Sequence, residues 1–170
     1  FDKISRAMGL GYPGGPIIDK LAKQGNKHAI EFPRAYLDDS YDFSFSGLKS
    51  AVLNYLNAQK MKKQEIVVED VAASFQEAVV EVLSTKAVNA AEEKGYKTIA
   101  LSGGVAANSA LREKITQMAN EKGIEIKFPG LDLCTDNAAM IGCAGYHNFI
   151  NGKIDDMSLN AVPNLKIDIN

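Results

Sequence analysis

The sequence predicts an α/β fold, and three neighbouring segments carry the prediction. An expected strand over 96–101, with the apolar run 98–100, is followed by a glycine turn, an amphipathic segment over 109–122 and a second short expected strand over 124–128. The order strand, helix, strand predicts a parallel pair with a right-handed crossover. Ligands in such sheets bind beyond the carboxyl ends of the strands. We therefore expect the glycine turn and the loop 131–136 to meet at one edge.

The turn itself, Leu101 to Asn108, is the first candidate site. Gly103 and Gly104 let the backbone approach a ligand with no Cβ between them, and the N–H groups at a helix start favour an anion or polar group. This predicts a nucleotide site. The alternative is a tight strand-to-helix connection in which Asn108 only caps the helix or faces solvent. The spacing matches neither the Rossmann fingerprint nor the Walker P-loop.

The segments before residue 96 are expected to be mostly helical. Apolar spacing predicts a short helix over 1–10, and two prolines and two glycines predict a shaped loop over 12–16 that is neither helix nor central strand. The further elements expected are a helix over 17–23, a loop over 26–41 that includes Asp38-Asp39-Ser40, a helix opened by Ser44 or Ser46 as caps, and one long or two nearly continuous helices over 67–94.

After residue 134 the sequence predicts a helix of small residues and a loosely tied tail. Thr135 is a candidate cap for this helix, and the tail, 151–170, is polar with scattered apolar residues such as Val162, Leu165, Ile167 and Ile169.

The composition is that of one ordinary globular domain. Of the 170 residues 46% are hydrophobic, so a core can be buried without disulfides or structural metals. Neither a membrane span nor a secretory leader is visible, and the expected location is the cytoplasm. Cys134 and Cys143 are expected to be reduced, buried residues rather than metal ligands.

Five blocks, in this order, resemble the TsaD family, the tRNA adenosine threonylcarbamoyltransferases long labelled O-sialoglycoprotein endopeptidases or glycoproteases. The blocks are Phe1-Asp2-Lys3, Gly11-Tyr12-Pro13-Gly14-Gly15-Pro16, Asp42-Phe43-Ser44-Phe45-Ser46-Gly47-Leu48-Lys49, Ser102-Gly103-Gly104-Val105-Ala106-Ala107-Asn108 and Cys134-Thr135-Asp136-Asn137-Ala138-Ala139-Met140. They cover what resembles the C-terminal half of that enzyme.

The resemblance implies a particular fold and division of the chain. Residues 1–170 would be the C-terminal lobe of the actin-like, sugar-kinase-like and Hsp70-like architecture (ASKHA, RNase H-like). A helical insertion would occupy roughly 42–94 and a nucleotide-binding α/β part roughly 96–150, with the N-terminal lobe absent.

The same resemblance implies an activity. The parent enzyme transfers threonylcarbamoyl from threonylcarbamoyl-AMP to the exocyclic amine of the adenosine beside the tRNA anticodon. The residues that would hold the adenylate or an ATP-type nucleotide are Asp2, Gly15, Asp19, Gly103, Gly104 and Asn108. Asp136 would be catalytic, holding one iron or zinc ion together with two histidines of the absent lobe. Without the resemblance, Asp2 and Asp136 would each be assigned only to a helix dipole.

The resemblance also implies partners. They are tRNA, a paralogous ASKHA subunit and an ATPase, with no membrane. The 19 basic and 21 acidic side chains are interspersed and give a formal charge of -2. Contacts with tRNA phosphates would therefore come from a local patch, the missing half or partner proteins.

Three alternatives remain open. A non-catalytic scaffold of the same fold could lose Asp2, Asn108 and Asp136 freely, whereas this sequence keeps all three. A metalloprotease, as in the older family label, has no support from a His-Glu-x-x-His motif. A small-molecule kinase of the same superfamily is disfavoured by the block from Cys134 to Met140. Because two metal ligands and half of the cleft are missing, the chain alone is expected to be inactive.

Overall fold

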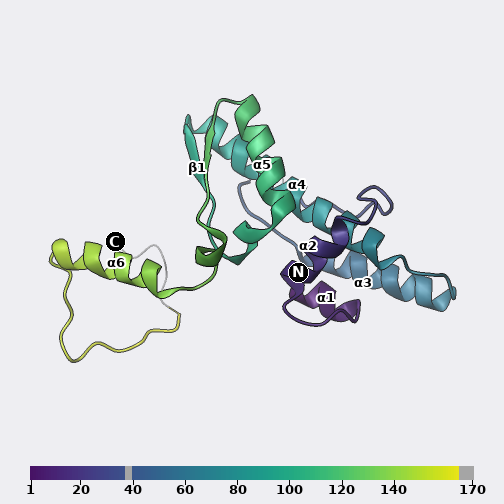
Figure 1. Cartoon of the computed structure of the whole chain (residues 1–170), viewed down its shortest axis with the longest axis horizontal. Coiled ribbons are helices and arrows are strands. Elements are labelled where there is room, and N and C mark those ends of the chain that lie inside the picture. Colours follow the sequence, from purple (N-terminus) through teal and green to yellow (C-terminus); the bar gives the residue numbers. More distant parts are fainter. Residues whose placement is uncertain (37–39, 165–170) are drawn as a thin grey trace. The chain divides into compact units, whose positions relative to one another are not determined.

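The structure is a computed structural model that describes residues 1–36 and 40–164 (Figure 1). These residues form an α/β structure of helices and a small parallel sheet. The chain divides into two compact units, Phe1–Thr135 and Asp136–Asn170. The first holds the sheet and the helices α1 to α5, and the second holds α6.

The first two helices pack on each other and contribute Ile4 and Ile18 to the core. They are α1 (Asp2–Ala7) and α2 (Gly14–Ala22). The prediction that 12–16 is not helical is wrong from Gly14 onward, since α2 begins there. Pro16 is compatible with this because it lies in the first helical turn, where its missing N–H has no partner inside the helix.

The long segment after residue 66 forms one continuous helix, α4 (Val68–Glu93), which is the first of the two predicted alternatives. Its N-terminal half joins α1, α2 and α3 (Ser46–Met61) in one apolar cluster. The prediction of a serine cap on α3 is wrong. The N-cap is Phe45 without a side-chain bond, and Ser46 is already the first helical residue.

The loop between α2 and α3 is irregular where the structure describes it, as predicted, and Asp38 and Asp39 lie outside the described residues. Its first part is fastened to α4. The Asn26 N–H donates to Asp70 Oδ1 (2.7 Å), and the Ile30 N–H donates to the Ser74 hydroxyl (3.1 Å). These bonds fix the end of α2 against the first turns of α4.

The predicted parallel strand pair is confirmed. The two strands are β1 (Thr98–Ala100) and β2 (Glu125–Lys127), with Ile99 opposite Ile126. Between them the chain forms a 3-10 turn, η1 (Gly104–Ala107), and α5 (Ser109–Glu121). α5 packs on the C-terminal half of α4 (Figure 1), where a second apolar cluster includes Val88 and Ile115.

The chain after β2 contains a short turn, η2 (Leu131–Leu133), and the helix α6 (Ala138–Ile150). The N-cap of α6 is Asn137, whose side chain accepts the Met140 N–H (3.0 Å), so the assignment of the cap to Thr135 is wrong. Cys134 is buried as predicted. Cys143 is exposed, against the prediction, because α6 has no buried residue among those described.

The described part of the tail, 151–164, contains neither helix nor strand, as predicted, and Leu165, Ile167 and Ile169 lie outside the described residues. In the described ranges, every helix is too short or too polar to cross a bilayer.

Candidate functional site

The carboxylate of Asp2 joins the start of α1 to the start of α2. Its Oδ1 accepts the Gly14 N–H at 2.8 Å. A Cβ on Gly14 would lie 2.6 Å from the Ser5 Cβ and 2.8 Å from the Asp2 Cα, so only glycine permits this approach of the two helices. Gly15, by contrast, has open space where its Cβ would be. Gly14 therefore serves packing, and Gly15 leaves room for another molecule.

Asp19 lies one helical turn beyond Gly15 on α2 and joins that helix to the start of α5. Its Oδ1 accepts the Ser109 hydroxyl at 2.9 Å, and its Oδ2 lies 3.4 Å from the Ser109 N–H. Lys23 lies 3.9 Å from the same Oδ2. A carboxylate at the first residue of α5 also complements the positive end of that helix.

Asn108 is buried and makes two bonds inside the fold. Its Oδ1 accepts the Leu111 N–H (2.9 Å), which makes it the N-cap of α5, and its Nδ2 donates to Gln76 Oε1 on α4 (2.7 Å). The capping role that the alternative assigned to Asn108 is confirmed, and the solvent-facing position is wrong because the side chain is buried. The predicted contact with a nucleotide stays a prediction.

Asn108→Ala is expected to lower the free energy of unfolding by about 2 kcal/mol, because it removes the cap and leaves the Gln76 side chain without its buried partner. Asn108→Asp keeps the cap acceptor, and the Gln76 amide can rotate to donate to it, so its loss is expected to be smaller. Thermal unfolding of the full-length variants would measure both losses. Equal losses would contradict the assignment of Asn108 as a cap.

The glycine turn leads into η1 and is exposed. Gly103 has φ +86°, a conformation that side chains with a Cβ rarely adopt, and a Cβ on Gly103 or Gly104 would meet nothing within 4 Å. The turn is thus open on its outer side. Through η1 it is continuous with Asn108 and the start of α5.

Arg112 fastens this turn to the loop after β2. Its Nε donates to the Ala106 carbonyl (2.5 Å), and its Nη2 lies 3.0 Å from the Pro129 carbonyl and 3.2 Å from the Cys134 sulfur. The predicted meeting of the turn and this loop at one edge is confirmed as far as Cys134. For Asp136, which begins the second unit, the expectation stays a prediction.

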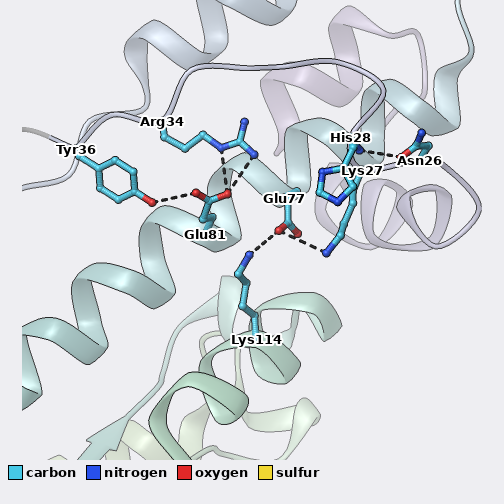
Figure 2. A network of polar contacts seen from close by, with 8 residues as sticks. All are labelled: Asn26, Lys27, His28, Arg34, Tyr36, Glu77, Glu81 and Lys114. Atoms are coloured by element: carbon cyan, nitrogen blue, oxygen red, sulfur yellow. Dashed lines mark hydrogen bonds and ion pairs between the residues drawn. The ribbon is translucent and has the colours of Figure 1, made fainter. Parts of the chain in front are cut away.

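A hollow of about 550 Å³ lies between α2, α4 and α5, beside Ser109. Its most buried charge is Glu77, which is paired with Lys114 (2.5 Å) and Lys27 (3.6 Å), as Figure 2 shows. Burial by itself raises the pKa of Glu77, but the hydrogen bond and charge of Lys114, together with Lys27, outweigh it and hold that pKa below its ordinary value. The ion pair therefore stabilises the fold above the unfolded-state pKa of Glu77, and this contribution is lost as the pH falls through the folded-state value.

A second group of polar side chains continues along α4 from this hollow (Figure 2). Glu81 accepts from Arg34 Nε (3.2 Å) and from the Tyr36 hydroxyl (3.2 Å). Burial and the nearby Glu81 carboxylate raise the pKa of Tyr36, so its phenol stays a protonated donor. These contacts hold the loop before α3 against α4.

Asp136 is exposed and its carboxylate makes no hydrogen bond or ion pair within the described ranges. It precedes the N-cap of α6, so it is not needed to cap that helix. The chemistry of its free carboxylate fits one position in an iron or zinc site. The residues that the structure describes hold no group of three metal-ligating side chains, so further ligands would have to come from outside them.

The expected residues of the first unit thus fall into a contiguous row, and Asp136 belongs to the second unit. Asp2 and Gly15 meet through Gly14, and Asp19 and Asn108 meet through Ser109. The sequence did not indicate three residues that hold this row and the glycine turn in place. They are Gln76, Ser109 and Arg112. Gln76 could have been noticed as a polar residue four positions after the buried Ala72, on the inward face of α4.

Open glycine backbone beside helix starts and carboxylates, on an α/β fold, is an arrangement typical of sites for polar or anionic small molecules. The family model described as tRNA N6-adenosine threonylcarbamoyltransferase matches residues 1–143, and the chain belongs to this family, TsaD.

Similar proteins bear the same name. A tRNA N6-adenosine threonylcarbamoyltransferase of Clostridioides difficile (strain 630) is 79% identical over 169 residues, which cover 99% of this chain and 50% of that protein. Proteins of the same name from Clostridium beijerinckii and Clostridium perfringens are 61% and 58% identical over 168 residues, covering 98% of this chain and 50% of each protein. The chain therefore spans about half the length of these relatives.

Proposed function

We propose that the full-length protein transfers threonylcarbamoyl from threonylcarbamoyl-AMP to the exocyclic amine of the adenosine beside the tRNA anticodon. The observation that carries the proposal is the 79% identity to a relative named for this transfer, which extends over nearly the whole chain. The chain would be the C-terminal lobe of an actin-like, ASKHA-type enzyme. An iron or zinc ion and the partner subunits would complete the enzyme.

We assign one row of residues in this chain to adenylate binding. The row consists of Asp2, Gly15, Asp19 and Asn108. Asp2 uses Oδ1 for the Gly14 N–H, and within the described residues its Oδ2 is left to accept from a ligand. A carboxylate oxygen is a suitable acceptor for ribose hydroxyls. The open side of Gly15 and of the Gly103-Gly104 turn gives the ligand space beside backbone N–H groups.

Asp136 would supply one carboxylate to the metal, whose other ligands would lie outside this chain. A bound metal ion polarises a carbonyl group. The residues of this chain then have the tasks of binding and orienting the adenylate, and no side chain in the row needs to act as a nucleophile. We further propose that the chain by itself has no activity, because its described residues offer only one such ligand.

The test uses the full-length protein with unmodified tRNA, threonylcarbamoyl-AMP and the partner proteins, and detects modified adenosine by mass spectrometry of the nucleosides. The wild type is expected to form it, and the 170-residue chain alone is not. Asp2→Asn keeps an acceptor for Gly14 and loses the charge, so it is expected to raise KM for the adenylate about tenfold or more. No product from folded wild-type protein would overturn the proposal, and product from the chain alone would overturn its inactivity.

A further inference from the structure

The outer face of α3 and the turn after it carry lysines without any acidic side chain. Between residues 43 and 64 the sequence has four lysines and no aspartate or glutamate, in a chain whose formal charge is -2. We call this surface the α3 basic face. Its members, all exposed, are Lys49, Ser50, Asn54, Asn57, Lys60, Lys62 and Lys63.

The helical members of this face lie on one side of α3. At 3.6 residues per turn, the positions from Lys49 to Lys60 fall within an arc of about 140°. The opposite side carries Leu48, Val52 and Leu56, which are buried in the core. The basic face is therefore a strip about 17 Å long from Lys49 to Lys60, with the partly buried Leu53 inside the same arc.

None of the four lysines forms an ion pair in the described part of the chain, whereas Lys27, Lys114 and Lys122 each have a carboxylate partner. The nearest acidic residue in sequence, Glu65, comes after the turn. Asp70, in the first turn of α4, already accepts the Asn26 N–H. The positive charge of the face is thus left for a molecule outside the chain.

Lys63 has a left-handed backbone conformation, which glycine adopts more readily than lysine. Its φ is +51°, and the bonds from Lys63 N to Lys60 O (3.1 Å) and from Gln64 N to Gln59 O (3.0 Å) form the helix end in which glycine is the usual residue. A lysine at this position has a conformational cost, and its charge extends the strip beyond the helix.

We propose that the α3 basic face binds the phosphate backbone of the tRNA substrate, an inference that rests on the proposed function. Lysines and asparagine amides are side chains that contact phosphates, and such contacts position a nucleic acid without reading its sequence. A polyanion is the partner that the uncompensated charge favours. The face would hold the tRNA and take no part in the chemistry.

The test compares two full-length variants that lose the same charge. K60Q/K62Q/K63Q changes the face, and K97Q/K122Q/K127Q changes three exposed lysines on and beside α5 and the sheet. Binding of an unmodified tRNA transcript is measured over a range of salt concentrations. The first variant is expected to bind about tenfold more weakly or worse and to reduce the slope of log K against log salt by up to about three. The control is expected to stay within about threefold of the wild type.

Two further readings separate binding from folding and from chemistry. K63G is expected to weaken tRNA binding without lowering the melting temperature, because glycine suits the positive φ. With K60Q/K62Q/K63Q, KM for tRNA is expected to rise while kcat at saturating tRNA is unchanged. Wild-type affinity and salt slope in the face variant, or equal losses in the control, would overturn the proposal.

The same experiment distinguishes this inference from the proposed function. If the wild type modifies adenosine and the face variant binds tRNA normally, the inference fails and the function stands. If the wild type binds tRNA but forms no product, and binding is weakened in the face variant and not in the control, the proposed function fails and the binding surface stands.

Discussion

In the full-length protein, Asp136→Ala is expected to lower the rate of threonylcarbamoyl transfer by about a hundredfold or more. Changes in groups that only support a metal ligand typically cost ten- to a hundredfold in metal affinity or activity, and a direct ligand should cost at least as much. Bound iron and zinc, measured by elemental analysis of the purified protein, are expected to fall together with the rate. With metal removed from both proteins, the melting temperature is expected to change little, because the Asp136 side chain has no partner within the described residues.

The neighbouring residue provides the control. Asn137 caps α6 through the Met140 N–H, so Asn137→Ala is expected to cost about 1 kcal/mol of stability while most of the activity and metal are kept. The two variants should therefore show opposite patterns. Normal rate and metal content in Asp136→Ala would remove this residue from the metal site.

The elements that sequence reasoning predicted well are those with long periodic patterns or strong local signals. The apolar stripe over 67–94 predicted one long helix or two nearly continuous ones, and the order strand, helix, strand from 98 to 128 predicted the parallel pair. Asn108 was identified as a cap candidate from residue type and position, and the structure has the expected bond. In each case the decisive interaction is local or follows the period of the element.

Interactions between distant segments were not predictable in this way. The start of α2 at Gly14 depends on the Asp2 carboxylate, which accepts the Gly14 N–H from twelve residues away. The Ser109 bond to Asp19 joins residues that lie ninety positions apart. Residue type alone indicated that Asp2 and Asp19 were polar, but only the packing of α1, α2 and α5 determines which of their oxygens are occupied.

Gly25→Ala is expected to lower the free energy of unfolding by about 3 kcal/mol or more. A Cβ on Gly25 would lie 2.0 Å from the Glu69 carbonyl oxygen and 2.7 Å from the Asp70 nitrogen. Both atoms belong to the backbone of α4, so no side-chain rotation relieves the overlap and the loop after α2 must move. That movement would also disturb the Asn26 bond to Asp70. Thermal unfolding of the full-length variant would measure the loss.

Gly47→Ala is the matched control, because a Cβ there would meet nothing within 4 Å and the residue lies in the first turn of α3. Alanine is the better helix former, so this variant is expected to gain up to about 1 kcal/mol. Opposite signs for the two substitutions would establish that the loop from Gly25 to Ile30 needs close backbone contact with α4. Because α2 carries Asp19, a displaced loop in Gly25→Ala should also weaken the adenylate binding that we propose for this residue. Unchanged stability would contradict this packing.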